Sequence, residues 1–210
     1  MSNEPVVFVI DDDERARESV CALVQSMGLN SESFASAEEF LEQHSNDNAG
    51  CLITDVRMLG ISGLELHEKL NEMGSILPVI VITAHATTAV TVQAMQGGAI
   101  TLLDKPYRED ELWSAIRKAL ALDAKNRFRN SHRQEIRQRR ERLTTSERDV
   151  LDLVVSGKAN KVIANQLDIS TRTVENRRRE IYRKMNADSI VDLVKMVIEA
   201  DAGILEQELR

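Results

Sequence analysis

The sequence contains few of the residues that build disulfide-linked or membrane-spanning proteins. It has 210 residues but only 2 cysteines, 3 prolines and 3% aromatic residues. Cys21 and Cys51 form no CxxC pair, so neither a disulfide scaffold nor a zinc site is supported. The longest apolar run, residues 77–84, has the length of a strand and falls short of the ~20 residues that a transmembrane helix needs. Because the N-terminus MSNEPVVFVID also lacks the basic and apolar regions of a signal peptide, we expect a cytoplasmic protein without membrane contact.

Charge is divided unequally along the chain. The formal net charge is −7, from 27 Lys and Arg against 34 Asp and Glu. Residues 1–124 contain 8 basic and 20 acidic residues, whereas residues 125–210 contain 19 basic and 14 acidic residues. The overall composition, 42% hydrophobic and 29% charged, is that of a folded globular protein. An acidic half and a basic half indicate different partners, and nucleic acid is a candidate partner of the basic half.

The acidic half alternates short apolar runs with amphipathic segments. Strands are predicted at residues 6–10, 31–34, 51–54, 79–83 and 100–103. Helices are predicted between and after them, at residues 14–27, 37–43, 63–73, 88–96 and 109–122. Five strands alternating with five helices indicate a doubly wound α/β fold, in which helices cover both faces of a parallel sheet. The ligand site of such a fold lies beyond the carboxyl ends of its strands.

Polar residues occupy these strand ends. They are Asp11, Asp12 and Asp13 after the first strand, Asp55 after the third, Thr83 at the end of the fourth and Lys105 after the fifth. Carboxylates from neighbouring strands form an oxygen-rich site suited to Mg²⁺. A carboxylate beside that metal stays ionised and can attack phosphorus, while a hydroxyl and an ammonium group bind the phosphoryl oxygens. A run of three Asp is by itself more often a solvated loop and helix cap, so the joint occurrence at four strand ends favours the phosphoryl site.

The basic half contains the pattern of two short helices joined by a tight turn. Thr144 and Glu147 form a capping signal for a helix that ends at Gly157, and a short helix is predicted at residues 160–167. A turn then leads to the basic stretch 172–185, RTVENRRREIYRKM. This arrangement is typical of a helix-turn-helix DNA-binding domain. An ordinary solvated helix is the alternative interpretation of the basic stretch taken alone.

A helical wheel divides the basic stretch into two sides. Val174, Ile181 and Met185 fall on one side, and the opposite side carries Glu175, Asn176, Arg179 and Arg183. Arg can pair with guanine, Asn with adenine and Glu with cytosine, so the second side is suited to reading base edges. Arg177, Arg178 and Lys184 fall at the flanks, where phosphates would be met.

Between the halves, residues 125–142 contain eight basic and two acidic residues and neither Gly nor Pro. Their few apolar residues, among them Phe128 and Ile136, predict an exposed helix, which can continue from the helix at residues 109–122, with Asn130 and Ser131 as a candidate break. We interpret the segment as a solvated basic spacer, and a phosphate-contacting arm is the alternative.

The motifs VIDDDERA, LITDVRM, VIVITAHA, the GA of GGAITLL, and LLDKPY together resemble the receiver domain of two-component response regulators, over residues 5 to about 122. The resemblance implies that Asp55 is the phosphoacceptor and that Mg²⁺ is held by Asp11, Asp12, Asp55 and the backbone carbonyl of Arg57. It also implies that Thr83 is the switch hydroxyl and that Lys105, followed by a cis peptide bond to Pro106, binds the phosphoryl group.

The chain departs from the receiver pattern at two positions. Leu59 stands where the family usually has Pro, and this departure is expected to alter only the stiffness of the loop. Leu102 stands where the family has an aromatic switch residue, which removes the usual aromatic carrier of the signal.

The motifs LTTSERDVL, G with NKVIANQL, DISTRTVENRRREIYRKM, and SIVDLVKM resemble the LuxR-type helix-turn-helix domain, over residues 143–197. The predicted DNA contacts are Lys161, Thr171, Thr173, Glu175, Asn176, Arg178, Arg179 and Arg183. At Arg177 the chain departs from the family, in which His is common. The last helix, predicted at residues 189–200, is where relatives of this type often dimerise on DNA.

The two resemblances together are those of a response regulator of the FixJ/NarL type. The expected parts are a receiver domain at 1–122, a basic helical linker at 123–142 and a DNA-binding domain at 143–210. The expected function is transcriptional regulation that depends on phosphorylation of Asp55 by a sensor histidine kinase, and not enzymatic turnover. The phosphorylated homodimer would bind double-stranded promoter DNA, with RNA polymerase as a further candidate partner.

Two alternatives from other classes remain open. One is a metal-dependent phosphohydrolase that uses Asp55 as its nucleophile, for which His85 is the only candidate acid or base in the sequence. The other is a constitutive DNA-binding protein whose acidic site has lost phosphorylation.

Overall fold

The computed structural model describes residues 4–45 and 48–208, and the side chains of these residues up to 201. The chain divides into two compact units, Met1–Arg127 and Phe128–Arg210. No helix in the described part of the chain combines the length and the apolar character needed to cross a membrane.

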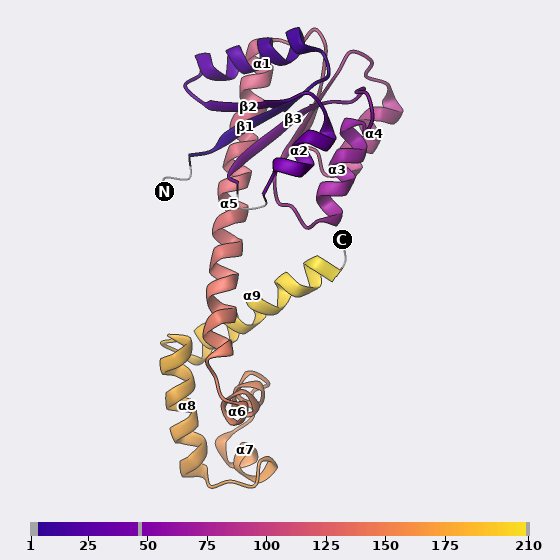
Figure 1. The fold of residues 1–210 in the computed structure, drawn as a ribbon. Coiled ribbons are helices and arrows are strands. Elements are labelled where there is room, and N and C mark those ends of the chain that lie inside the picture. Colours follow the sequence, from indigo (N-terminus) through magenta and orange to yellow (C-terminus); the bar gives the residue numbers. More distant parts are fainter. Residues whose placement is uncertain (1–3, 46–47, 209–210) are drawn as a thin grey trace. The chain divides into compact units, whose positions relative to one another are not determined.

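A parallel sheet forms the centre of the first unit (Figure 1). Its strands are β1 (Val6–Ile10), β2 (Asn30–Phe34), β3 (Gly50–Asp55), β4 (Val79–Thr83) and β5 (Thr101–Asp104). They lie in the order β2-β1-β3-β4-β5, and every neighbouring pair is parallel. The predicted doubly wound fold is therefore confirmed. Because the strand order reverses between β1 and β3, the carboxyl ends of these two strands flank the crevice in which such folds bind ligands.

Helices cover both faces of this sheet (Figure 1). The helices of the first unit are α1 (Glu14–Ser26), α2 (Ala37–Gln43), α3 (Gly63–Glu72), α4 (Thr88–Gln96) and the first part of α5 (Glu109–Glu141). Alternate residues of β1 point to opposite faces. Val7 and Val9 pack with buried residues of α1 and α5, whereas Phe8 and Ile10 pack with buried residues of α2, α3 and α4. The near-continuous apolar strands are thus explained by burial on both sides.

The helix predicted at residues 109–122 and the helix predicted in the spacer form one continuous helix, α5. The predicted helix at residues 109–122 continues without interruption to Glu141, and there is no break at Asn130 or Ser131. The Ser131 hydroxyl donates to the carbonyl of Phe128, one turn earlier in the same helix, at 3.0 Å. This hydrogen bond is made inside the helix and does not end it. The interpretation of residues 125–142 as a solvated spacer is wrong at Ile136, which is 1% exposed and packs in the core of the second unit.

Asp123 fastens α5 to the start of β3. Its side chain is almost fully buried, and one carboxylate oxygen accepts the N–H of Gly50 at 3.0 Å. The same oxygen accepts from Nε of Arg127 at 2.8 Å, and Arg127 also donates to the carbonyl of Asn48. A buried carboxylate is stable here because both the amide and the guanidinium compensate its lost hydration.

The second unit is built from helices packed around one apolar cluster. They are the last part of α5, α6 (Thr145–Val155), α7 (Asn160–Gln166), α8 (Thr171–Met185) and α9 (Ile190–Glu208). The predicted capping signal is confirmed, because the Thr144 hydroxyl accepts the N–H of Glu147 and the Glu147 carboxylate accepts the N–H of Thr144. α9 continues beyond the predicted end at residue 200.

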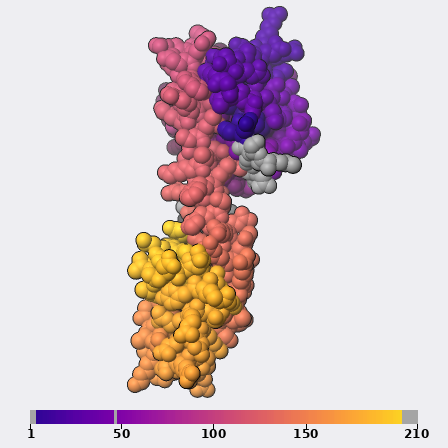
Figure 2. Space-filling view, turned by 90° about the vertical axis from the view of Figure 1, so that its left-hand side faces the viewer, coloured from indigo at the N-terminus to yellow at the C-terminus, as the bar shows by residue number. Residues whose placement is uncertain are grey.

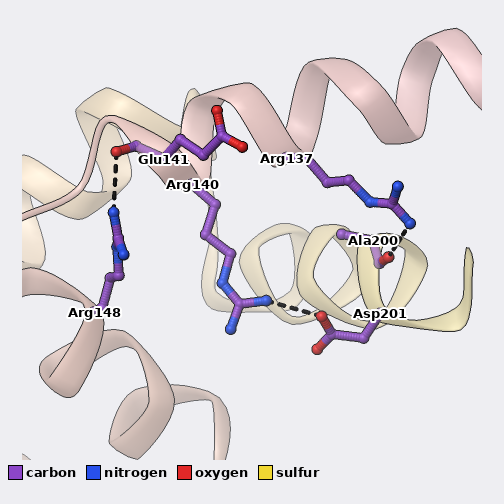
Figure 3. Close-up of a pocket in the computed structure, with 6 residues that line it drawn as sticks. All are labelled: Arg137, Arg140, Glu141, Arg148, Ala200 and Asp201. Carbon is purple, nitrogen blue, oxygen red and sulfur yellow. Dashed lines mark hydrogen bonds and ion pairs between the residues drawn. The ribbon is translucent and has the colours of Figure 1, made fainter. Parts of the chain in front are cut away.

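Arginines of α5 contact α9 within the second unit (Figure 3). Arg140 forms an ion pair with Asp201 at 2.8 Å, and Arg137 donates to the carbonyl of Ala200 at 3.3 Å. These basic residues of the predicted spacer therefore stabilise the packing of the second unit. Part of α9 remains at the surface of this unit (Figure 2), where Val191 is more than half exposed.

The first residue of α3, Gly63, lies against the backbone of Asp55. A Cβ at this position would lie 2.0 Å from the carbonyl oxygen of Asp55. We expect Gly63→Ala to push α3 away from β3 and to lower the free energy of unfolding by about 1–3 kcal/mol. Gly97→Ala is the matched control, because Gly97 has an ordinary φ of −67° and an added Cβ would come no closer than 3.3 Å to another atom. Urea unfolding that finds the two variants equally stable would contradict the predicted collision.

Candidate functional site

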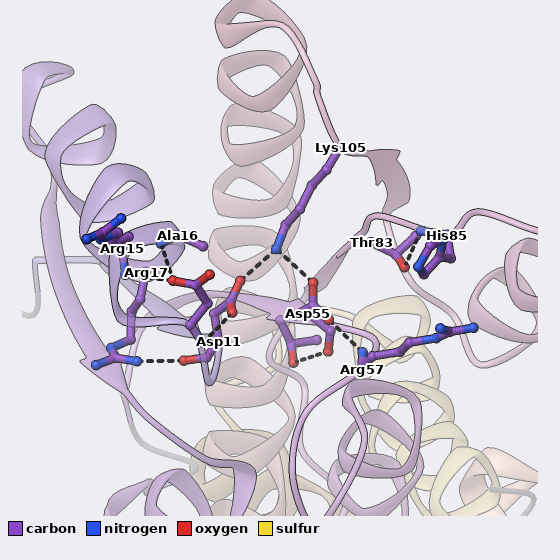
Figure 4. Close-up of polar contacts among 11 residues, drawn as sticks. Asp11, Arg15, Ala16, Arg17, Asp55, Arg57, Thr83, His85 and Lys105 are labelled. Atoms are coloured by element: carbon purple, nitrogen blue, oxygen red, sulfur yellow. Dashed lines mark hydrogen bonds and ion pairs between the residues drawn. The ribbon is translucent and has the colours of Figure 1, made fainter.

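Side chains from three strand ends meet at the carboxyl edge of the sheet (Figure 4). Asp11 follows β1, Asp55 ends β3 and Lys105 follows β5. The Lys105 Nζ lies 2.8 Å from Oδ2 of Asp11 and 2.8 Å from Oδ1 of Asp55. The two Asp residues are 6% and 8% exposed. Two nearly buried carboxylates on adjacent strands would repel each other, and the shared ammonium group compensates both charges.

The charge of Lys105 is secured by these contacts. Burial by itself lowers the pKa of Lys105, but the hydrogen bonds and negative charges of Asp11 and Asp55 outweigh it and raise that pKa above its usual value. An ammonium group has three N–H donors, and the two carboxylates use two of them. The third donor can bind an oxygen of an incoming anionic group.

The Asp55 carboxylate is held in one orientation. Its Oδ2 accepts the N–H of Arg57 at 2.6 Å, while its Oδ1 accepts from Lys105. Charge-assisted hydrogen bonds to both oxygens restrict rotation of the side chain. The Asp55 carboxylate is therefore held in a fixed orientation at the end of β3.

Thr83 is buried at the end of β4. Its hydroxyl oxygen accepts the N–H of His85 at 3.2 Å, and its carbonyl accepts the N–H of Lys105 at 2.7 Å. Thr83 therefore contacts the backbone of the loop after β5 that carries Lys105, and its hydrogen bonds are not made with the Asp55 carboxylate. The peptide bond between Lys105 and Pro106 is cis, as predicted.

The other two acids of the Asp run have different partners. Asp13 caps α1 by accepting the N–H groups of Arg15 and Ala16 at 2.9 and 3.2 Å. Asp12 is exposed, and its Oδ2 accepts the N–H of Leu59 at 3.1 Å. For Asp13, the alternative interpretation of the three-Asp run as a solvated loop and helix cap is therefore correct.

The predicted metal ligands are not gathered into one cluster. Among the described residues, no three carboxylate, imidazole or thiol side chains lie close enough together to hold a metal ion. The physical reason is that Lys105 lies between Asp11 and Asp55, while Asp12 is hydrogen-bonded to Leu59. The donor chemistry still fits Mg²⁺, which binds to a few carboxylate oxygens and completes its shell with water.

The helix α8 has the predicted division into a buried and an exposed side. Val174, Ile181 and Met185 are at most 1% exposed. The exposed side carries Arg172, Glu175, Asn176, Arg179 and Arg183. Arg172 is missing from the sequence-based set of DNA contacts, although its spacing of four and seven residues from Asn176 and Arg179 places it on the same side. Arg183 is also exposed, but it forms an ion pair with Glu180 at 2.7 Å.

The remaining predicted DNA contacts lie at the helix ends. Lys161 and Thr171 are exposed near the N-termini of α7 and α8. Thr173 is half-buried, and its hydroxyl lies 2.8 Å from that of Ser170, the cap residue of α8. Thr173 therefore takes part in capping the helix.

Two basic residues of α8 are bound within the unit instead of projecting from it. Arg178 donates to Oδ1 of Asn160 at 2.8 Å and so joins α8 to α7. Lys184, predicted at a phosphate-facing flank, donates to both Glu147 oxygens at 2.9 and 2.7 Å and joins α8 to α6. Sequence position alone did not distinguish these internal cations from the exposed ones.

Comparison with known proteins agrees with this division into two units. The family described as "Response regulator receiver domain" matches residues 7–117, and the family described as "Bacterial regulatory proteins, luxR family" matches residues 141–197. The transcriptional regulatory protein FixJ of Azorhizobium caulinodans is 42% identical over 194 residues, covering 92% of each chain. The response regulator protein TodT of Pseudomonas putida is 41% identical over 191 residues, covering 91% of this chain and 84% of TodT.

Solved structures give the same result. The response regulator StyR is similar with a TM-score of 0.82 and 40% identity, over 92% of this chain and 98% of that chain. Full-length FixJ from B. japonicum is similar with a TM-score of 0.56 and 33% identity, over 94% of this chain and 98% of that chain.

The ion pair between Glu147 and Lys184 predicts a pH-dependent stability of the second unit. Burial raises the pKa of Glu147, but the hydrogen bonds from Lys184 and Thr144 outweigh it, and the net pKa is lowered. A carboxylate with a lowered folded-state pKa stabilises the fold above its ordinary pKa of about 4.5, and this contribution is lost as the pH falls further.

We expect Glu147→Gln to lower the free energy of unfolding at pH 7 by about 1–3 kcal/mol and to flatten its decline in acid. Chemical unfolding at a series of pH values measures both effects. Glu135→Gln is the control, since Glu135 pairs with Arg139 at an exposed site that contributes little. If both variants lost the same free energy of unfolding, the contact between Glu147 and Lys184 would not be the cause of the pH-dependent stability.

Proposed function

This chain belongs to the response regulators that join a receiver domain to a luxR-family DNA-binding domain, and we propose that phosphorylation of Asp55 controls its binding to promoter DNA. It is a phosphorylation-dependent transcriptional regulator. Membership of a family of transcription regulators also argues against the phosphohydrolase alternative. The observation that carries the proposal for Asp55 is the Lys105 ammonium group shared between the nearly buried Asp11 and Asp55.

The proposed donor is a phosphohistidine of a sensor histidine kinase. An oxygen of Asp55 forms a bond to phosphorus as the bond between phosphorus and the imidazole nitrogen breaks, and the kinase histidine is released. Lys105 then binds a phosphoryl oxygen, because its pKa keeps it cationic. The Thr83 hydroxyl, which has a proton to donate, is the proposed second contact of the phosphoryl group.

Mg²⁺ is the proposed cofactor, with Asp11, Asp12, Asp55 and the backbone carbonyl of Arg57 as its protein ligands. When bound, the cation offsets the negative charge that the carboxylates and the phosphoryl group bring together. The contribution of this chain is to supply hard oxygen donors from two adjacent strand ends.

We propose that the phosphoryl group changes the packing around α4 and β5 and so promotes a homodimer. Leu102, at the position where an aromatic residue is usual, is partly buried against the apolar cluster beneath α2, α3 and α4. It is a shorter side chain than an aromatic one, so the proposed signal is a shift of this cluster and not the rotation of a ring.

The exposed side of α8 is the proposed reader of the DNA major groove. It combines cationic, amide and carboxylate groups outside with an apolar contact behind, as a recognition helix requires. RNA polymerase remains a candidate partner of the DNA-bound homodimer. We propose a receiver domain at 1–122, a basic helical linker at 123–142 that also packs onto the units on either side through Asp123 and Ile136, and a DNA-binding domain at 143–210. We also propose a cytoplasmic location.

Asp55→Asn tests the phosphoacceptor. Incubation with Mg²⁺ and a small acyl phosphate should add one phosphoryl group to the wild type and none to this variant, as measured by intact mass. Asp13→Asn is the control, because the Asp13 side chain caps α1 and only its backbone N–H, which the substitution keeps, contacts a site residue, Asp11. Phosphorylation should also raise DNA binding by the wild type and by the Asp13→Asn control, and not by Asp55→Asn. Equal DNA binding by wild type and Asp55→Asn, with or without the phosphodonor, would favour the constitutive alternative.

Arg179→Ala tests the recognition helix. The DNA site is first selected by the phosphorylated wild type from random duplexes. For this site, we expect the variant to lose about 1–3 kcal/mol of binding free energy and to discriminate less at one base pair. Arg117→Ala removes the same charge from the first unit, where Arg117 lies over Trp113. Fluorescence anisotropy at several salt concentrations should show no change for this control. A uniform loss on all sequences would make Arg179 a phosphate contact instead.

A further inference from the structure

A backbone hydrogen bond connects the loop after β3 to the acidic site. The N–H of Leu59 donates to Oδ2 of Asp12 at 3.1 Å, across a separation of 47 residues in the chain. The side chain of Leu59 is 82% exposed, so it contributes little packing to either loop. What position 59 supplies to the site is therefore its N–H group.

Each carboxylate of the proposed magnesium site already has a partner in this chain. Lys105 holds Asp11 and Asp55, and Leu59 holds Asp12. As these contacts stand, the three carboxylates do not form a cluster of three metal ligands among the described residues. The Lys105 contact is made by a long, flexible side chain that can move away, whereas the Leu59 donor is held in place by the backbone, so this contact breaks only when the Asp12 side chain itself moves.

We infer that the Leu59 N–H competes with Mg²⁺ for Asp12 and so lowers the affinity of the acidic site for the metal. The inference rests on the proposed magnesium site and adds to it a residue that regulates its occupancy. To ligate a cation with its full charge, Asp12 must weaken or give up the hydrogen bond to Leu59. Leu59 is thus a positioning residue, because it acts on the metal only through Asp12.

The identity of residue 59 decides whether this competition exists. Every residue except proline carries a backbone N–H, so any non-proline residue can make the contact with Asp12 and proline cannot. The departure at Leu59 therefore affects more than the stiffness of the loop. It sets how much Mg²⁺ the protein needs before Asp12 turns to the metal.

The test compares two substitutions by calorimetric titration of the whole protein with MgCl₂. Leu59→Pro removes the N–H, and we expect its dissociation constant for Mg²⁺ to fall about three- to tenfold, the usual net effect of one solvent-exposed hydrogen bond. Leu59→Ala keeps the N–H and removes the exposed side chain, so its affinity should stay within about twofold of the wild type. An unchanged affinity in Leu59→Pro, or an equal gain in both variants, contradicts the inference.

A second measurement does not depend on the folding of the proline variant, which also restricts Met58. In the wild type, the amide proton resonance of Leu59 should move upfield and its exchange with water should accelerate as Mg²⁺ saturates the site. An amide that keeps its shift and exchange rate at saturation shows that Asp12 never leaves Leu59, and the inference is then wrong. If the wild type binds no Mg²⁺ at all, the proposed magnesium site itself fails, which is a different result.

Discussion

The first unit depends on one ammonium group between two carboxylates. The sheet brings the ends of β1 and β3 side by side, which places Asp11 and Asp55 together in a nearly buried position. Two such charges are unfavourable without a cation, and Lys105 supplies it from the loop after β5. Because Lys105 pairs with both carboxylates, any group that binds Asp55 or Lys105 must alter the ion pairs that connect the ends of β1, β3 and β5.

In the second unit, some basic residues join helices to one another and others are exposed at the surface. Lys184 and Arg178 join α8 to α6 and α7, and Arg140 joins α5 to α9. Exposed cations such as Lys161 of α7 and Arg172 and Arg179 of α8 lie where they can face DNA phosphates and bases. The excess of positive charge in this half of the chain thus overstates the charge available to a nucleic acid.

The helix α5 contributes residues to the cores of both units. Leu112, Ile116 and Ala119 pack beneath the sheet of the first unit, and Ile136 packs in the apolar cluster of the second. Between these segments, Asp123 holds the helix to the start of β3. Residues that the sequence marks as a spacer are therefore structural parts of the two units, joined by one uninterrupted helix.

The sequence by itself determined the elements of this protein and the kinds of residue at its site. Periodicity identified the strands and most helices, and the alternation of strands with helices required Asp11, Asp55, Thr83 and Lys105 to lie at one edge of a parallel sheet. The tertiary structure alone decided which partner each charged group has. Asp12 binds Leu59 and Lys184 binds Glu147, over separations of 47 and 37 residues. Such contacts depend on the three-dimensional approach of distant segments, which local propensity and helical wheels do not contain.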